Sequence, residues 1–259
     1  MMPGAERGAS GDDASRVTRV WELVSRQAAS RRGRASVGDV CAVAVTSLDI
    51  SGAWVIAGDG AQPGQAMCAT DLVSESLAEV QITLGEGPCH DATVTGVPVL
   101  AANLTDGTRT RWAVFADAAV RAGAAAVFAF PLRIGAIRVG VLGLYRQKEG
   151  SLDAFQLGDA LILADTATML LLDAEARQTA DPLEGAGLAS QSAGLAAHHA
   201  EIAQATGMLT EQLGVGIAEA FARLRAYAYA EDKRLSDVAH DIVTRRLRLD
   251  PDPRDFGAR

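Results

Sequence analysis

The chain has 259 residues, of which 49% are hydrophobic and 22% charged, so it can hold one large or two modest domains with buried cores. Its net charge of −8 argues against a protein that coats nucleic acid or binds anionic membranes through its overall charge. Cys41, Cys68 and Cys89 lack the spacing of a metal site, and the first residues lack the apolar core of a signal peptide, which together predict a cytoplasmic protein.

The chain begins with a stretch that we expect to be a disordered tail, residues 1–15. A helix over residues 13–26 is predicted next, because Val17, Val20, Trp21 and Val24 fall on one face. The basic run 26–34 follows. We interpret it as a solvated connector, with contact to RNA as the alternative. Residues 37–48 predict a second apolar helix, and no run of 18 apolar residues predicts a transmembrane segment.

The next elements alternate between short strands and helices. Two hairpins are predicted from apolar runs that flank turn residues, the first around Gly58-Asp59-Gly60 and the second around Gly135. Helices are predicted at 71–80 and 112–122, with a strand at 97–101 between them. Ser151 is expected to cap a long apolar helix that continues to residue 172. Hairpins make antiparallel neighbours, so the first two-thirds of the chain predicts an α+β domain with an antiparallel sheet and flanking helices.

One stretch of this region is a candidate ligand site. Glu86 lies between two glycines and is followed by Pro88-Cys89-His90, and Trp112 lies further along. Trp112, Glu86, Cys89 and His90 are therefore the candidate residues of a ligand pocket, although Glu86 is also expected to cap backbone amides. The alternative is that this domain binds no ligand and serves only as a dimerisation and spacing element. Because Cys89 precedes His90, three sensing roles of Cys89 are also considered: a redox thiol, a haem ligand and a chromophore attachment site. The simpler alternative is that Cys89 is a small core residue.

Several blocks of this region carry a family resemblance. They are Leu84-Gly85-Glu86-Gly87-Pro88-Cys89, then Gly96-Val97-Pro98-Val99, then Arg111-Trp112 with Phe115-Ala116, and finally Pro131-Leu132 through Gly140-Val141-Leu142-Gly143-Leu144-Tyr145. Together they resemble a GAF domain, most closely the GAF units that precede ANTAR modules in actinobacterial regulators. The N-K-x-x-x-F-x-x-x-D-E signature of cyclic-nucleotide-binding GAF domains is missing from the sequence. The resemblance therefore implies a sensor domain over residues 16–177 whose small ligand, if it has one, is unassigned.

A linker and a second unit complete the chain. Residues 178–194 contain Pro182 and three glycines, which predict a hinged linker. Residues 195–250 predict three short amphipathic helices that share one core, and 251–259 form a tail. Asp232 is the expected N-cap of the third helix.

Three blocks of this second unit resemble the ANTAR family. They are Glu201-Ile202-Ala203-Gln204-Ala205-Thr206-Gly207-Met208-Leu209, then Glu219-Ala220-Phe221-Ala222-Arg223-Leu224-Arg225, then Leu235-Ser236-Asp237-Val238-Ala239. The resemblance implies a three-helix domain that binds RNA hairpins in a nascent transcript leader and acts in antitermination, fused to a sensor and working as a homodimer. The expected RNA-binding residues are Gly207, Arg223, Arg225, Tyr229, Lys233 and Arg234. Thr206 and Tyr229 stand where the family usually has basic residues.

No catalytic pattern occurs in the sequence. There is no G-x-S-x-G elbow, P-loop or dinucleotide fingerprint, so we predict a protein that is not an enzyme. The prediction is a signal-responsive RNA-binding antitermination regulator. Two alternatives stay open. One is a dimeric protein-interaction regulator with lapsed RNA binding, which Thr206 and Tyr229 favour, and the other is a redox or chromophore sensor that uses Cys89.

Overall fold

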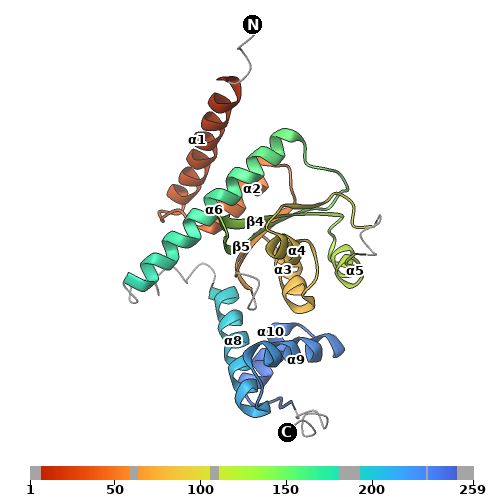
Figure 1. The fold of residues 1–259 in the computed structure, drawn as a ribbon. Helices are drawn as coiled ribbons and strands as arrows, with labels where there is room; N and C mark the ends of the chain where they lie inside the picture. The colour runs from red at the N-terminus through yellow and green to blue at the C-terminus, as the bar shows by residue number, and fades with distance from the viewer. Residues whose placement is uncertain (1–6, 59–63, 106–110, 181–192, 232, 250–259) are drawn as a thin grey trace.

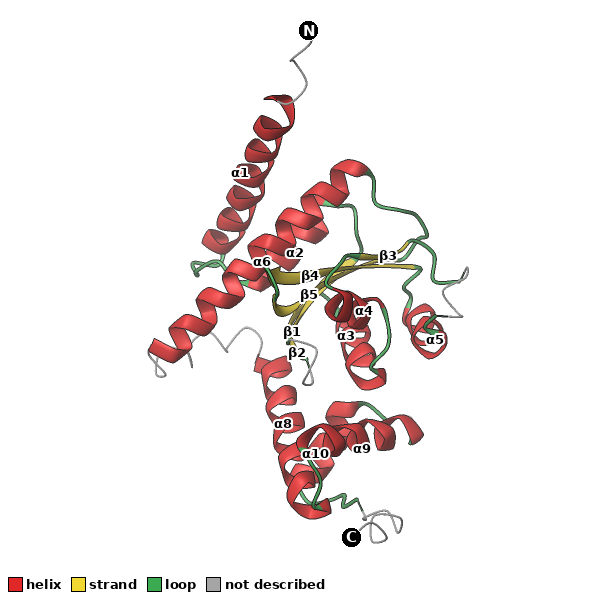
Figure 2. Cartoon of the chain, in the orientation of Figure 1, coloured by secondary structure: helices red, strands yellow, loops and turns green. Residues whose placement is uncertain are grey.

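The computed structural model describes residues 7–58, 64–105, 111–180, 193–231 and 233–249. It contains an α+β unit followed by a three-helix unit, as predicted (Figures 1 and 2). The elements of the first unit are α1 (Arg7–Ser30), α2 (Val37–Ser47), β1 (Gly52–Ala57), β2 (Gln65–Ala69), α3 (Leu72–Leu84), α4 (Pro88–Thr95), β3 (Val99–Ala101), α5 (Ala113–Ala122), β4 (Ala126–Ile134), β5 (Ile137–Arg146) and α6 (Ala154–Ala180). Those of the second are α8 (Ala193–Leu213), α9 (Ile217–Ala230) and α10 (Leu235–Val243).

The sheet is antiparallel throughout and has the strand order β2-β1-β5-β4-β3. Both predicted hairpins are present, and Gly135 makes the second turn with a φ of 59°. Gly143 lies opposite Trp54, and its lack of a side chain leaves room for the Trp54 indole. The central strands β1, β4 and β5 are buried at consecutive positions, so both of their faces are covered over most of their length.

The two faces of the sheet are covered by different helices (Figure 2). One core contains side chains of α1, α2 and α6, among them Val24, Val40 and Leu163, which are 0% exposed. The other lies under α3, α4 and α5 and contains Trp54 and Phe115, also 0% exposed. Helices therefore flank the sheet on both sides, in line with the predicted α+β domain.

Several helix ends differ from the sequence expectation. α1 begins at Arg7, inside the stretch expected to be a tail, while residues 1–6 lie outside the described residues. α6 is capped by Asp153 instead of Ser151: Asp153 Oδ1 accepts the N–H of Gln156 at 2.8 Å, and Gln156 Oε1 accepts the N–H of Asp153 at 3.0 Å. This reciprocal pair is a capping box, which satisfies two amides that the helix itself leaves without partners.

α6 bears on the expectation that no transmembrane segment is present. It holds an 18-residue window with a mean hydropathy of 1.4, which by length and composition alone is enough to cross a membrane. Half of that window is buried inside the molecule, against the sheet and the first two helices. The same pattern occurs in core helices of soluble domains, so it is weak evidence for a membrane span.

The three helices of the second unit share one small core, as predicted. Leu209, Leu224, Leu235 and Val238 are 0% exposed, so each helix contributes to it. The predicted linker lies mostly outside the described residues, between the end of α6 and the start of α8. The first two helices of this unit pack against the sheet unit, α8 on β2 and α9 on α3.

Candidate nucleic-acid interface

Two of the predicted RNA-binding residues are free at the end of α9. Tyr229 is 59% exposed in the last turn of the helix, and Lys233 is exposed just beyond it. The backbone N–H of Lys233 donates to the carbonyl oxygen of Ala228 at 2.9 Å, which fixes the chain after the helix. Tyr229 therefore presents an aromatic surface, and Lys233 a cation, at one end of the unit. These are the groups that stack on bases and neutralise phosphates.

Two others, Arg225 and Arg234, meet the sheet unit. Arg225 Nη2 donates to the carbonyl oxygen of Leu84, the last residue of α3, at 2.9 Å. Arg234 Nε lies 3.3 Å from Oε2 of Glu79, one of the carboxylates of the same helix. α3 thus contacts two arginines of the three-helix unit, Arg225 and Arg234, which are 9 residues apart in the sequence.

The environment of Arg225 is only partly aqueous. Burial lowers the pKa of its guanidinium, which lies 5.6 Å from the centre of the Phe221 ring. Its Nε is buried and has no acceptor among the residues that the structure describes. A cation held in this way is not available to a phosphate until the contact with α3 opens.

The remaining two predicted residues have different surroundings. Arg223 forms an ion pair with Glu219 one turn earlier, at 2.7 Å. A Cβ on Gly207 would meet nothing within 4 Å among the described residues, so this part of α8 is open. The neighbouring Thr206 is only 3% exposed, and its hydroxyl donates to the carbonyl oxygen of Ile202 at 2.7 Å. Position 206 therefore lies in a buried setting.

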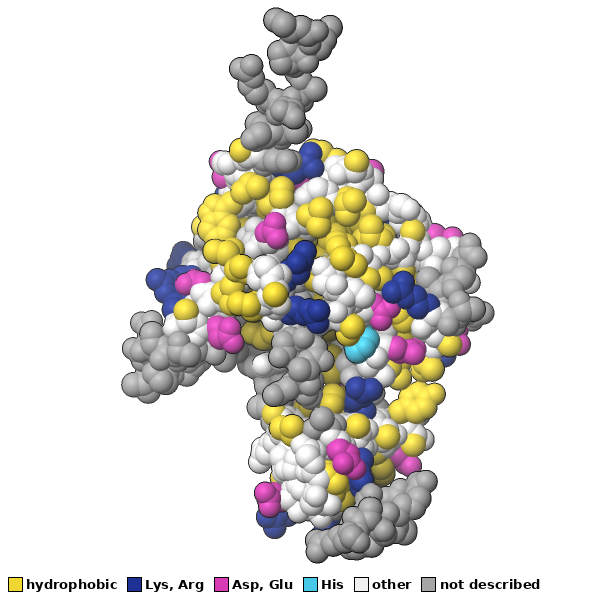
Figure 3. Space-filling model, viewed as in Figure 1, with side chains coloured by type: hydrophobic (Ala, Val, Ile, Leu, Met, Phe, Trp, Pro, Cys, Tyr) yellow, Lys and Arg dark blue, Asp and Glu magenta, His cyan; other side chains and the backbone are white. Residues whose placement is uncertain are grey.

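Further arginines follow α10. Arg245, Arg246 and Arg248 are exposed, and Arg245, just after the C-cap of α10, has a positive φ of 59°. On the face shown in Figure 3, however, Lys and Arg side chains are interspersed with Asp and Glu over both units. In this arrangement the cations of the three-helix unit do not form one continuous surface on that face.

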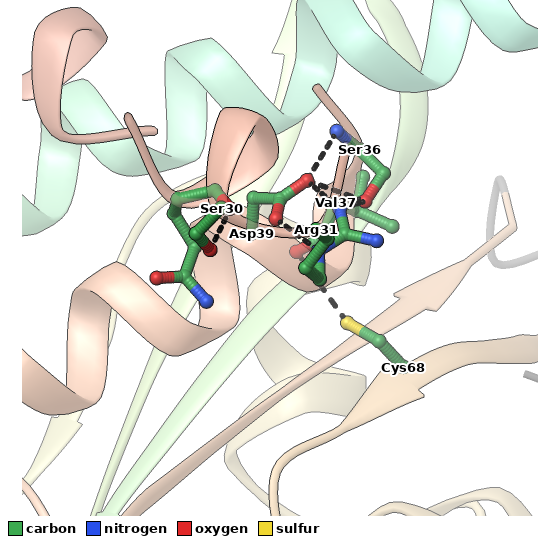
Figure 4. Close-up of polar contacts among 7 residues, drawn as sticks. Ser30, Arg31, Ser36, Val37, Asp39 and Cys68 are labelled. Atoms are coloured by element: carbon green, nitrogen blue, oxygen red, sulfur yellow. Dashed lines mark hydrogen bonds and ion pairs between the residues drawn. The ribbon is translucent and has the colours of Figure 1, made fainter. Parts of the chain in front are cut away.

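The basic run near the N-terminus has a structural role. Arg31 forms an ion pair with Asp39, whose side chain is 0% exposed. Asp39 Oδ2 also accepts the N–H of Ser36 at 2.9 Å and its hydroxyl at 2.8 Å, at the start of α2 (Figure 4). Arg26 pairs with Glu22 at 3.1 Å. The connector interpretation holds only in part: residues 26–30 belong to α1, which continues past the predicted end at 26, and Arg31 anchors the buried Asp39 of α2.

The four candidate ligand-pocket residues do not converge. A cavity of about 450 Å³ lies at the β3 edge of the sheet and is lined by Trp112, Arg111, Thr95 and residues 97–101. Trp112 Nε1 donates to Asp91 Oδ2 at 2.9 Å. Glu86 is instead engaged at the start of α5, where its Oε1 accepts the N–H groups of Val114 and Phe115 at 3.0 and 2.8 Å. The expected capping by Glu86 is therefore observed.

Cys89 does not have the properties of a reactive thiol. It is 2% exposed, and burial raises its pKa to about 12, so the thiolate is scarce at neutral pH. Its backbone N–H donates to Gln81 Oε1 at 2.7 Å, which joins α4 to α3. The adjacent His90 is exposed. Cys89 therefore acts as a small core residue in this structure.

The other two cysteines lie together, which their spacing in the sequence did not indicate. The sulfur atoms of Cys41 on α2 and Cys68 on β2 are 2.7 Å apart, and both residues are buried. Cys68 Sγ also donates to the carbonyl oxygen of Val37 at 3.6 Å (Figure 4). Among the described residues, no group of three His, Cys, Asp or Glu side chains is arranged to hold a metal ion.

The sequence pattern gave no indication of the groups that join the two units. Glu79 Oε1 accepts the backbone N–H of Ser236 at 3.2 Å and its hydroxyl at 2.9 Å, at the first turn of α10. Glu79 falls on a helix whose residues were assigned only to the sheet unit. Its partner lies 157 residues away, so no local motif could have identified the pair.

Residues 195–243 match the family model described as "ANTAR domain". These bounds cover the same three helices, α8 to α10. The match spans the second unit only and leaves the sheet unit outside it. No curated protein matches the chain.

The solved structures similar to this chain include several GAF domains. The GAF domain from a Coxiella burnetii phosphoenolpyruvate-protein phosphotransferase is 11% identical, with a TM-score of 0.47, and covers 63% of this chain and 98% of that one. The corresponding Acinetobacter GAF domain is 13% identical, with a TM-score of 0.46, and covers 64% and 97%. A domain of a Sinorhizobium meliloti sensor histidine kinase protein is 18% identical, with a TM-score of 0.42, and covers 52% and 86%. The fold class rests on the strand order and helix placement described above.

Proposed function

We propose that this chain is a cytoplasmic RNA-binding regulator in which the α+β unit senses a signal and the three-helix unit binds hairpins of a nascent transcript leader. Binding stabilises an antiterminator structure and thereby disfavours the terminator. The observation that carries the proposal is the family match over residues 195–243, which coincides with a separately packed three-helix core. The exposed Tyr229 and Lys233 give this unit a stacking group and a phosphate-binding group.

The site residues follow from the same proposal. Tyr229 and Lys233 contact RNA directly, and Arg225 and Arg234 join them when they are released from α3. Arg223 and Gly207 lie at the margin of this surface. Seen alone, a unit with balanced charge binds RNA only through such a local cluster, because phosphate neutralisation supplies most of the affinity.

We further propose that the chain works as a homodimer through α1 and α6. Val17 and Trp21 on α1 are 50% and 47% exposed, and Leu161 and Met169 on α6 are 42% and 60% exposed. Hydrophobic side chains gather on the face of Figure 3 over these two helices. Burying this surface against a second copy would place two three-helix units on one RNA.

A redox or chromophore sensor based on Cys89 is the weaker alternative, because that thiol is buried and protonated. An interaction module with lapsed RNA binding is the second alternative. The exposed cations at the end of α9 and after α10 favour RNA binding over it, since neither set is needed for the core.

The proposal is tested with the full chain and its own RNA. Transcripts that crosslink to the tagged protein in its source cells are sequenced, and the recovered leader is transcribed with its terminator in vitro. The proposal predicts hairpin-containing leaders, binding that weakens steeply with salt, and more readthrough when the protein is added. The proposal would be contradicted if the protein left terminator readthrough unchanged and bound duplex DNA as well as it binds the leader RNA.

A further inference from the structure

We infer that α3 of the sheet unit holds the three-helix unit in a form closed to RNA, with the Glu79 carboxylate bound where an RNA phosphate would bind. This inference rests on the proposed function and adds its regulation. It is carried by three independent contacts, namely Glu79 with the start of α10, the end of α3 with Arg225, and Ile82 with the core of the three-helix unit.

The first contact is the cap of α10. The N-cap position of this helix is Arg234, whose side chain makes no capping hydrogen bond. The amides of a first helical turn have no partners within the helix, and a negative group is favoured there. Glu79 supplies that group, since it accepts both the N–H and the hydroxyl of Ser236 and pairs with Arg234. A phosphate needs the same donors, so carboxylate and RNA compete for them.

The second contact is at the end of α3. Leu84 is the last residue of the helix, and its carbonyl oxygen accepts from Arg225. Gly85 follows in the left-handed region, with a φ of 64°, and leaves space for the guanidinium: a Cβ there would lie 2.5 Å from Nη2 of Arg225. The backbone at this point is therefore shaped around the arginine.

The third contact is apolar. Ile82 packs partly against the core under α3 to α5 and partly against the core of the three-helix unit. It lies on α3 between Glu79 and Leu84, so one helix provides the ion pair, the apolar contact and the carbonyl. The two units also meet where α8 packs on β2. Contacts between domains of one chain open more readily than the domain cores do.

The consequence is a coupled equilibrium. In the closed form, Arg225 and Arg234 are bound by α3, and only the open form presents them together with Tyr229 and Lys233. The apparent RNA affinity is then reduced by the fraction of molecules that are open. Anything that weakens the contact with α3 raises RNA affinity without touching the RNA-binding residues.

The first test changes Glu79 in the full chain. Glu79→Ala removes the cap of α10 and the partner of Arg234, and we expect RNA affinity to rise between about five- and thirtyfold, the range for a loss of 1–2 kcal/mol. Glu75→Ala is the matched control, because it removes the same charge one turn earlier on α3 and has no partner in the three-helix unit among the described residues. The probe is the hairpin leader recovered by crosslinking.

The second test uses two glycines with the same backbone strain. Gly85→Ala pushes a methyl group into Arg225, whereas Gly96→Ala at the end of α4, with a φ of 71°, meets only Arg133 Cδ at 3.9 Å. Both variants place a side chain in the left-handed region, so they carry the same kind of backbone strain. Only Gly85→Ala should raise RNA affinity.

Hydrogen exchange of the Ser236 amide reports the contact without RNA. We expect faster exchange in Glu79→Ala than in Glu75→Ala and the unchanged chain. If exchange does not change, or if RNA binds Glu79→Ala no better than the control, the inference is overturned while the proposed function stands. If neither the unchanged chain nor any variant binds the leader, the proposed function fails and this inference fails with it.

Discussion

Glu79 on α3 accepts two hydrogen bonds from Ser236 at the first turn of α10, so a carboxylate of the sheet unit caps a helix of the three-helix unit. This pair is the clearest physical link between the two units. It gives the sheet unit a direct means of controlling α10. Any change in the position of α3 alters the end of α10 where Arg234 lies.

The exposed end of α9 should carry RNA affinity in every form of the protein. Lys233→Ala should weaken binding uniformly across hairpin sequences and reduce the slope of log K against log salt by about one. Lys148→Ala is the matched control, because Lys148 is also exposed but lies after β5 in the sheet unit. Titrations at several salt concentrations measure both, and an identical slope for the two variants would refute a phosphate contact at Lys233.

Tyr229 should act through stacking. Tyr229→Ala should lose about 1–3 kcal/mol of RNA binding, whereas Tyr229→Phe keeps the ring and should bind nearly as well as the unchanged chain. The stability of the fold should not change, because Tyr229 is 59% exposed. Binding titrations and thermal unfolding of the three proteins distinguish stacking from a structural role. Equal binding by Ala and Phe variants would exclude stacking.

The thiols should be inert in the native protein. Burial raises the pKa of Cys89 to about 12 and that of Cys41 well above its ordinary value. A thiol reagent at pH 8 should therefore react slowly with the folded chain. After unfolding it should react readily with all three cysteines, Cys41, Cys68 and Cys89. Rapid modification of Cys89 in the native state would revive the redox alternative.

Asp159 should hold α1 against α6. Its side chain is 2% exposed and lies 2.7 Å from Arg19 and 3.8 Å from Arg16. Asp159→Asn leaves the partly buried arginines without their anion and should cost about 1–3 kcal/mol of unfolding free energy. Glu22→Gln breaks an exposed pair on the same helix and should cost less than about 0.5 kcal/mol. Chemical denaturation of both variants measures the difference, and equal losses would contradict a buried role for Asp159.

Tyr145 should make the fold sensitive to high pH. Desolvation and the nearby Asp71 raise the pKa of its hydroxyl to about 12, and the hydroxyl donates to Asp71 Oδ2 at 3.1 Å. The folded state thus favours the protonated form, so this stabilisation is complete below about pH 10, the ordinary tyrosine pKa, and is lost as the pH rises toward 12. The stability advantage of the unchanged chain over Tyr145→Phe should be constant at pH 7–9 and shrink above pH 10. An advantage that does not change with pH would contradict this.

The sequence predicted the elements that local patterns determine. The apolar periodicity placed all three helices of the second unit, and the turn residues placed both hairpins. Asp71 accepts the N–H of Ser74 at 2.7 Å, which caps the helix where the sequence placed it. These features depend on residues within a few positions of one another, so a single sequence contains the necessary information.

The long-range features could not be predicted in this way. The predicted cap of α10, Asp232, lies outside the described residues, and the observed acceptor for Ser236 is Glu79. The spacing of Cys41 and Cys68 gives no sign of their contact, because the packing of α2 on β2 is a tertiary contact. Arg225 was assigned to RNA from the family pattern, and only its contact with Leu84 shows that the sheet unit holds it.

RNA should bind the three-helix unit at the end of α9, and crosslink mapping locates this site without any substitution. The full chain is irradiated with the hairpin leader, digested, and the modified peptides are identified by mass spectrometry. We expect crosslinks in the peptides that contain Tyr229 and Lys233, with stronger crosslinking of Arg234 peptides in Glu79→Ala. Crosslinks confined to the sheet unit, such as the basic run 26–34, would contradict it.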